Sequence, residues 1–305
     1  TFENLSPIPI NNGEFAIAPD MFEDIPISHP VKLAPIYPCG LVTCMGPTNL
    51  IPIAEQTLKN LWRCGSRITS GGNPQRFHWN DDLSMGWIGV ARAWMGDGSG
   101  ALDAVLNGWV AGCLKTNGFL TSQARTPEAR IKMDWMQNQL SGVANVINEM
   151  LMQSHSGIIH IFPAIPKTWK NVSFGHLRAI GAFLISAAQI RGVIQWVAIE
   201  ALKDGICRVK NPWQAKKIAV WKTNPQPAEK SIIVISDKND CFEFNLKAQE
   251  TIVLSEEGKN IQKIRIQNRR NKNFNPWAQK FPALVIPKNG DKTWVCWWGK
   301  SDGKK

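Results

Sequence analysis

Two short polar segments in the first half of the chain contain the residue types that bind sugars. The segment HWNDD (residues 78–82) brings two carboxylates, an amide, an imidazole and an indole together, directly before a helical pattern. Carboxylates accept hydrogen bonds from sugar hydroxyls, and a tryptophan ring offers an apolar face on which a pyranose can stack. Trp79 and Asp82 are therefore candidates for a sugar-binding rim. The structural alternative is that one of the two aspartates, or Ser84, only caps the helix that follows.

The second segment, DWMQNQ (residues 134–139), precedes another helical pattern and contains three amide side chains. Amides both donate and accept hydrogen bonds, so they suit a hydroxyl-rich ligand or the orientation of a water molecule. The alternative is a polar loop with an asparagine cap. Glycoside hydrolysis usually needs two carboxyl groups that flank the scissile bond. Residues 1–165 contain 13 acidic side chains, and their spacing alone does not choose a pair.

The elements that must carry these segments are helices. Apolar residues recur at steps of three and four over residues 101–115, and similar patterns predict helices over residues 54–64, 84–95 and 142–155. From about residue 158 the pattern changes to short runs rich in β-branched residues, separated by Gly, Asn, Asp, Lys and Pro. These runs are residues 158–162, 181–190, 193–202, 206–210, 217–221, 231–236, 241–245, 251–255, 263–267 and 283–286. We therefore predict an α+β multidomain chain: helices over residues 1–165, then an antiparallel β-sandwich over residues 166–305.

The net charge of +11 is divided unevenly between these two parts. Residues 1–165 contain 10 Lys and Arg against 13 Asp and Glu, a net charge of −3, whereas residues 166–305 contain 25 against 11, a net charge of +14. The lysines of the second part are scattered between strands, which is typical of edge protection and solubility. Polyanion binding by a basic β-domain is therefore a lesser alternative, and we expect no nucleic-acid partner.

Several common kinds of site are missing from the sequence. It contains no Walker loop, G-x-G-x-x-G, H-E-x-x-H or G-x-S-x-G motif. Its seven cysteines form no C-x-x-C pair and no cluster with zinc-ligand spacing, so we expect neither a metal nor another cofactor. No uncharged apolar run approaches the roughly 18 residues of a membrane span, and no basic-then-apolar leader follows Thr1. We expect no membrane partner; the patterns leave the oligomeric state open.

A longer stretch resembles a known family of enzymes. Residues 147–187, INEMLMQSHSGIIHIFPAIPKTWKNVSFGHLRAIGAFLISA, followed by WVAIEALKDGICRVKNPW, are similar to the C-terminal part of glycoside hydrolase family 95. In that family a helix ending in E-M-L-L-Q-S-H leads into a strand, then into P-A-x-P-x-x-W and G-L/H-L-R-A-x-G-A/G-F. GWIGVARAWMGDG (residues 86–98) resembles the family's G-W-s-x-A-W-x-x-x-x-W-A-R-L-G-D-G helix. The resemblance is strong over residues 84–213 and faint over residues 25–40.

The resemblance implies an architecture and an activity. The family has an (α/α)6 barrel followed by a β-domain, and it hydrolyses α-L-fucosides or related α-L-galactosides with inversion. Residues 1–165 would then be the C-terminal half of the barrel, and residues 166–305 the β-sandwich domain. The family's general acid, a Glu, belongs to the half of the barrel that precedes this chain, so we expect a truncated hydrolase with a glycan substrate. A secreted or periplasmic location is expected from the family.

The resemblance also implies residue roles. The family's catalytic Asp lies just before the E-M-L-L-Q-S-H helix, and a gap-free count places it at Asn138, or at Gln137 by the pattern of a divergent branch. Both are amides, and an amide cannot take a proton from water as the base of an inverting reaction must. Either Asp134 substitutes from upstream, or the chain is a non-catalytic carbohydrate-binding pseudoenzyme.

Two further sugar-binding candidates come from the weaker part of the resemblance. SHPVKLAPIYP (residues 28–38) is similar to the family's R-H-L-S-H-L-Y-x-L-Y-P, in which an Arg-His pair binds the sugar. Only the histidine of that pair, His29, is present here, and a lone histidine near prolines is more often structural. Trp87, in the helix that follows the HWNDD segment, is expected near the sugar on the same grounds.

Overall fold

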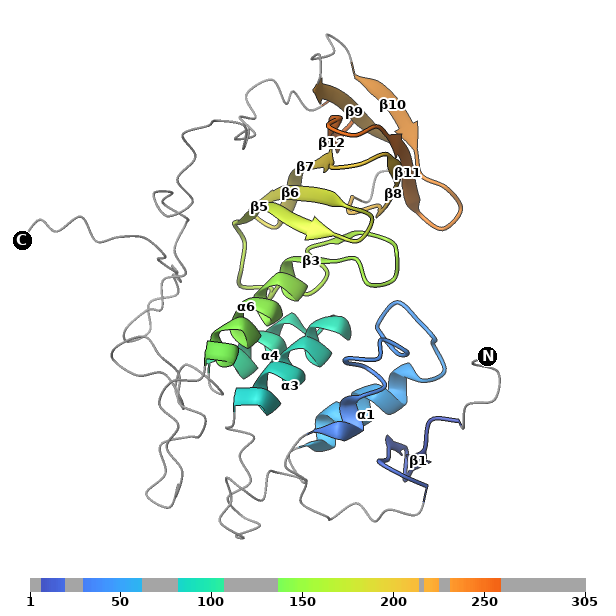
Figure 1. Cartoon of the computed structure of the whole chain (residues 1–305), viewed down its shortest axis with the longest axis vertical. Helices are drawn as coiled ribbons and strands as arrows, with labels where there is room; N and C mark the ends of the chain where they lie inside the picture. The colour runs from blue at the N-terminus through green and yellow to red at the C-terminus, as the bar shows by residue number, and fades with distance from the viewer. Residues whose placement is uncertain are drawn as a thin grey trace, which may run out of the picture. The chain divides into compact units, whose positions relative to one another are not determined.

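The computed structural model describes residues 7–19, 30–61, 82–106, 137–213, 217–224 and 231–258 (Figure 1). The chain divides into a unit of Thr1–Lys259 and a second unit of Asn260–Lys305, and every element below belongs to the first unit. The strands predicted at residues 263–267 and 283–286 lie outside the described residues. No helix in the described ranges is long and apolar enough to cross a membrane.

Four α-helices are described: α1 (Ile51–Asn60), α3 (Asp82–Trp94), α4 (Gly98–Asp103) and α6 (Gln137–Leu151). Helix α1 begins three residues earlier than predicted, with a proline in its first turn, where the missing N–H leaves no helix bond unmade. Helix α4 is capped by Asp97, whose carboxylate accepts a 2.8 Å hydrogen bond from the backbone N–H of Gly100. The predicted helix over residues 101–115 is described only up to residue 106.

Helix α6 begins five residues earlier than predicted and ends four residues earlier. It ends because Met152–Gln153 leaves the helix and forms strand β3, which pairs antiparallel with β4 (His160–Ile161). The backbone N–H of Phe162 donates to the carbonyl oxygen of Leu151 at 2.8 Å, so one of the last helix carbonyls is satisfied by the strand segment.

The helices share a hydrophobic core with the short 3-10 helix η2 (Val31–Leu33) and the hairpin of β1 (Ile10–Asn11) and β2 (Glu14–Phe15). The hairpin is tied to α1 by a 2.9 Å hydrogen bond from the backbone N–H of Phe15 to Thr57 Oγ1, and by the side chains of Asn60 and Glu14. The fully buried members of this core include Phe15, Leu33, Ile36, Ala54, Ile88, Ala101, Val146 and Met150. The partial (α/α)6 barrel remains a prediction.

The second half contains a six-stranded antiparallel sheet in the order β10-β9-β12-β7-β6-β5. Its strands are β5 (Val172–Ala179), β6 (Phe183–Ile190), β7 (Val193–Ala201), β9 (Lys217–Asn224), β10 (Ile232–Ile235) and β12 (Thr251–Glu256). A second layer pairs β8 (Gly205–Lys210) with β11 (Cys241–Leu246), and Ile159 joins it through a parallel bridge to Val209.

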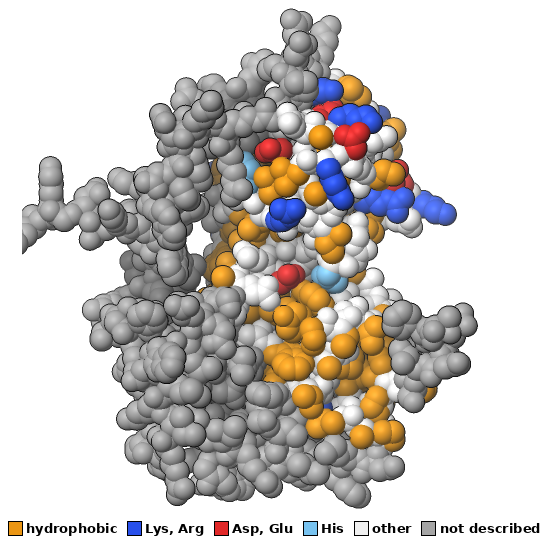
Figure 2. All heavy atoms as spheres, viewed as in Figure 1, with side chains coloured by type: hydrophobic (Ala, Val, Ile, Leu, Met, Phe, Trp, Pro, Cys, Tyr) orange, Lys and Arg blue, Asp and Glu red, His pale blue; other side chains and the backbone are white. Residues whose placement is uncertain are grey.

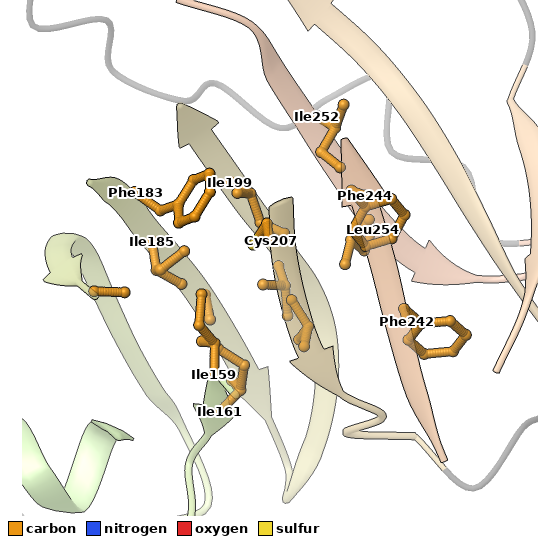
Figure 3. Close-up of a cluster of buried hydrophobic side chains, with 14 of the residues drawn as sticks. Ile159, Ile161, Phe183, Ile185, Ile199, Cys207, Phe242, Phe244, Ile252 and Leu254 are labelled. Atoms are coloured by element: carbon orange, nitrogen blue, oxygen red, sulfur yellow. The ribbon is translucent and has the colours of Figure 1, made fainter. Parts of the chain in front are cut away.

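The two layers enclose a second hydrophobic core (Figure 3). The large sheet contributes Phe183, Ile185, Ile199, Ile252 and Leu254, and the small sheet contributes Cys207, Phe242 and Phe244. Burial alternates along β8 and β11, as expected for strands with one face on a core. The described strands therefore form a largely antiparallel β region consistent with a β-sandwich. The domain boundary at residues 165 and 166 stays a prediction.

Strand β5 was not among the predicted strands. Its pairing with β6 shifts register between Phe174 and Leu177, and His176 has φ of 56°, so β5 contains a β-bulge. The backbone N–H of His176 is satisfied by Ser186 Oγ of β6 at 3.0 Å instead of by a ladder carbonyl. The bulge and Gly175 interrupt the apolar alternation that identifies strands in a sequence.

Candidate sugar-binding end of two helices

The expected site residues fall into three groups in the structure. His29, Trp79 and Asp134 lie outside the described residues. Asp82 is the first residue of α3, and Gln137 and Asn138 are the first two residues of α6. The two polar segments singled out by sequence thus lead directly into α3 and α6. Trp87 forms the third group by itself, and the contacts of its side chain are described below.

Trp87 lies in α3 and is partly buried against the helical core. Its indole N–H donates a hydrogen bond to the backbone carbonyl oxygen of Tyr37, and the Tyr37 ring meets it edge-on with ring centroids 6.5 Å apart. Its N–H is therefore occupied by the protein and is not available to a sugar hydroxyl. The same contact holds the segment after His29, which contains η2, against α3.

Helices α3 and α6 pack against each other and run in the same direction. Near their middle, a Cβ added to Gly89 would lie 2.6 Å from Cγ2 of Val146, so the glycine is what permits this close approach. Near their C-terminal ends, Trp94 Nε1 donates a 2.7 Å hydrogen bond to Glu149 Oε2. The contact nearer the C-terminus of α3 is therefore also the contact nearer the C-terminus of α6, which means that the two helices are parallel. It follows that Asp82 and Gln137, the two first residues, lie toward the same end of the pair.

The C-terminal ends of the two helices meet in a buried aromatic and polar cluster. The Trp94 ring stacks on His155, with centroids 4.0 Å apart and planes inclined by 19°, and Tyr37 meets Trp94 edge-on at 5.2 Å. Burial raises the pKa of the Glu149 carboxyl, and the hydrogen bond from Trp94 opposes part of this change. The cluster thus combines a partly desolvated carboxyl with a donor that stabilises its ionised form.

Gln153 completes the cluster. Its Nε2 amide donates at 2.9 Å to the backbone carbonyl oxygen of Ala93 in α3 and also at 2.9 Å to that of Glu149 in α6. One amide group therefore satisfies carbonyls in the last turns of both helices. Gln153 is only 1% exposed, and its Oε1 atom has no hydrogen-bond partner in the described part of the chain.

Two histidines at this junction have pKa values below that of a free imidazole. Burial lowers the pKa of His155, whose two ring nitrogens have no hydrogen-bond partner among the described residues. Burial, followed by the nearby charges of His155 and Lys210, lowers the pKa of His160 to about 4. His160 is the β4 residue that pairs with Gln153. Protonation at this junction between helices and strands is therefore opposed by desolvation.

The Gly-Asp-Gly and Pro-Ala-x-Pro segments contact each other at the same junction. A Cβ added to Gly98 would lie 2.1 Å from the carbonyl oxygen of Ala164, so only glycine allows the two backbones to approach so closely. Asp97 caps α4 and also pairs with Arg92, with 2.7 Å between Nη1 and Oδ2. These sequence motifs therefore have structural roles at the junction.

Glu149, Gln153 and His155 are not among the site residues expected from the sequence, although they lie in the segment that resembles family 95. The available signal was the presence of a carboxylate, an amide and an imidazole at the end of an otherwise apolar helix pattern. Among the described residues, no group of three or more His, Cys, Asp and Glu side chains could hold a metal ion.

Lysines and arginines gather over the β-strands on the face shown in Figure 2, in line with the uneven charge of the sequence. Several of them have acidic partners on neighbouring strands or turns. The ion pairs are Arg208–Glu243 at 2.7 Å, Lys222–Glu250 at 2.8 Å, Lys247–Asp204 at 3.0 Å and Lys210–Asp240 at 3.7 Å. The neighbouring carboxylates partly neutralise the positive potential around these side chains, which weakens their attraction for a polyanion.

The fold and the junction define a largely antiparallel β-domain attached to a helical part. Residues 153–254, about a third of the chain, match the family model of glycoside hydrolase family 95, C-terminal domain. The matched stretch runs from the last residue of β3 into β12. The chain therefore contains a domain related to the C-terminal domain of that family, and the resemblance inferred from sequence is confirmed to this extent.

The other comparisons add little to this assignment. Among solved structures, the chain is similar to a GH127 beta-L-arabinofuranosidase from Geobacillus stearothermophilus T6, with 13% sequence identity and a TM-score of 0.30. The alignment covers 74% of this chain and 40% of that structure, and so low a similarity carries no argument about fold or activity. A search of curated protein sequences finds no match.

Proposed function

We propose that this chain is part of a glycoside hydrolase that removes terminal α-L-fucosyl or α-L-galactosyl residues from glycans with inversion. The observation that carries the proposal is the packing of α3 and α6 in the same direction, with Asp82 and Gln137 at the same end. Two polar segments more than 50 residues apart in the sequence lead into that end. The family 95 match beginning at Gln153, two residues after α6, supports the sugar class.

The proposed roles follow the chemistry of each side chain. Asp134 is the candidate base, because a carboxylate can take a proton from the attacking water and an amide cannot. Gln137 and Asn138 would orient that water or bind sugar hydroxyls. Trp79 would stack on the sugar ring, Asp82 and His29 would bind hydroxyls, and Trp87 would offer a ring face. The general acid would come from outside this chain.

The second candidate function is carbohydrate binding without catalysis. It is favoured by one observation: the first turn of α6 has no acidic residue, and two amides stand where the family resemblance expects the catalytic Asp. Amides at these positions preserve hydrogen bonding to hydroxyls but remove the proton acceptor. On this hypothesis the same end of the helix pair binds terminal fucosyl groups and leaves the glycosidic bond intact.

The test is the release of L-fucose or L-galactose from α-linked substrates. The assay uses this chain and, in parallel, the product of the complete reading frame, with the anomer of the released sugar followed by NMR. Release of the β-anomer from an α-linked substrate would establish the proposed function. No release from either protein, while both remain folded and bind fucosylated glycans in a titration, would establish the non-catalytic alternative. Neither release nor binding would overturn both.

A further inference from the structure

The large sheet ends at β10, and the isoleucines of this strand are exposed. Within the described part of the chain, β10 pairs with β9 alone, so the backbone groups along its other side face no strand (Figure 1). Ile232, Ile233 and Ile235 are 70%, 44% and 62% exposed, whereas Val234 packs partly against the core between the two layers. Strand β10 thus presents both an open edge and exposed apolar side chains.

The opposite edge of the sheet, β5, is protected in ways that β10 is not. Strand β5 contains the β-bulge between Phe174 and Leu177 and the exposed charge of Arg178, and both features hinder pairing with another strand. Strand β10 pairs with β9 in a continuous register, and residues 231–236, Ser-Ile-Ile-Val-Ile-Ser, contain neither a charge nor a proline. Of the usual protective features it has its short length of four residues. A short apolar strand can therefore add to the sheet at β10.

The occupant that fits this edge on chemical grounds is β10 of a second copy. It is extended, uncharged and β-branched, as a strand that covers isoleucines must be. A two-fold axis perpendicular to the sheet at Val234 pairs two copies antiparallel, with Ile233 of each opposite Ile235 of the other. These two isoleucines lie on the same face of the strand, as opposite residues in a sheet must. Within residues 231–236 this register places no charge opposite another charge.

The charge of the β region makes such an association weak and dependent on salt. Residues 166–305 contain 25 Lys and Arg against 11 Asp and Glu, a net charge of +14, so two copies repel each other in dilute salt. Salt at about 1 M shortens the range of this repulsion to about 3 Å. Pairing of two copies should therefore tighten as salt is added, whereas binding of an acidic segment should weaken. A contact through one short strand also belongs to the small and weak class of interfaces.

We infer that two copies of this chain associate through β10, which joins their large sheets edge to edge into one continuous sheet. Ile233 and Ile235 contribute most to the affinity, because each becomes covered by its counterpart in the second copy. The inference goes beyond the proposed function and does not depend on it, since no sugar takes part in the contact.

Sedimentation of the full chain tests the inference between about 10 µM and about 1 mM, at about 0.1 M and about 1 M salt. We expect the average mass to rise with concentration from that of one copy toward that of two, and to rise further at the higher salt. A monomer under every condition, or association that weakens with salt, would overturn the inference. A mass that grows beyond two copies would contradict the two-fold arrangement.

Two charge variants test which residues make the contact. Ile233→Glu and Ile235→Lys each place a charge opposite an isoleucine, so each alone should associate at least about 10-fold more weakly than wild type. An equal mixture of the two should associate at least about 5-fold more tightly than either alone, because the introduced carboxylate of one copy faces the introduced amine of the other.

Ile206→Lys is the matched control, at an isoleucine of β8 that is 60% exposed. It should associate like wild type, and unfolding midpoints show that all three variants remain folded. If Ile233→Glu associates as tightly as wild type, or if Ile206→Lys is weakened to the same extent, the contact lies elsewhere and the inference is wrong. Failure of the mixture to associate more tightly than its components would contradict the register.

Hydrogen exchange of wild type provides a test without any substitution. We expect the amides of residues 232–235 that face away from β9 to exchange at least about 5-fold more slowly at about 1 mM than at about 10 µM, because new bonds between strands protect them. The amides of residues 206–209 in β8 should not change. Slow exchange in β10 that is independent of concentration would show that the edge is occupied within one copy, and the inference would be wrong.

Discussion

The side-chain amide of Gln153 donates a hydrogen bond to the backbone carbonyl oxygen of Ala93, 60 positions earlier in the sequence, at 2.9 Å. The same amide nitrogen donates to the carbonyl oxygen of Glu149. Gln153 follows α6 and pairs with β4, so this contact joins α3, α6 and the start of the β region. Gln153, which lies in the segment that resembles family 95, therefore connects the helices to the start of the β region.

Replacing Gln153 with methionine tests that joint. Methionine has a similar length and no donor, so the hydrogen bonds to the carbonyl oxygens of Ala93 and Glu149 would both be lost, and Ala93 would keep only the 3.0 Å bond from the backbone N–H of Gly96. We expect a loss of about 2–3 kcal/mol in the free energy of unfolding. Chemical denaturation measures it. Gln195→Met is the control, at a glutamine that bonds the carbonyl of Val193 two residues away, and it should change stability by less than about 0.5 kcal/mol. Equal losses in both would contradict the role of Gln153.

Replacing Gly98 with alanine tests the close approach of the Gly-Asp-Gly and Pro-Ala-x-Pro segments. The added Cβ would lie 2.1 Å from the carbonyl oxygen of Ala164, and backbone atoms on both sides must shift to admit it. We expect a destabilisation of about 1–3 kcal/mol, measured by thermal or chemical unfolding. Gly175→Ala, where a Cβ meets nothing within 4 Å, is the matched control and should be close to neutral. An unaffected Gly98→Ala variant would show that the segments do not touch.

The stability of the chain should fall on acidification below neutral pH. His160 has a pKa of about 4 in the folded chain against 6.5 for an unperturbed histidine, and the pKa of His155 is lowered in the same direction. The unfolded chain therefore binds protons first as the pH falls, and stability that is complete above pH 6.5 is lost progressively toward about pH 4.

His160→Gln provides the check on this pH dependence. Glutamine keeps a polar side chain but takes up no proton, so denaturation midpoints between pH 7 and pH 4 should fall less steeply in the variant than in wild type. Glu149, whose pKa is raised by burial, acts in the opposite direction and is unchanged in the comparison. Identical profiles for the two proteins would show that His160 does not titrate in this range.

Gln137→Asp and Asn138→Asp distinguish a lost base from a displaced one. If the amides mark a lost base, one of the two aspartates should restore release of L-fucose or L-galactose by the product of the complete reading frame. If Asp134 is the base, neither substitution should raise the rate, and Asp134→Asn should abolish it. Gln139→Asp is the control for adding a carboxylate to this region. Equal gains from all three substitutions would argue for a general charge effect.

The local sequence pattern is sufficient to predict which segments are helices and which are strands, but not the residues at which they begin and end. Helices were predicted at α1, α3 and α6 because apolar residues recur at helical spacing, and seven of the β runs from residue 181 to 255 coincide with strands. The end of α6 was placed too late because Met152 and Gln153 continue the helical pattern but pair with His160 and Ile161. The bulged strand β5 was missed because its bulge interrupts the alternation.

The sequence by itself determined the chemistry of the two polar segments, the uneven charge of the two parts and the change from helical to strand pattern. These properties depend on residue type and short spacing. Only the tertiary structure decided that α3 and α6 run in the same direction, that their first residues lie toward one end, and that Glu149, Gln153 and Gly98 form the junction. Those facts depend on contacts between residues tens of positions apart, which a periodicity of two or 3.6 residues does not encode.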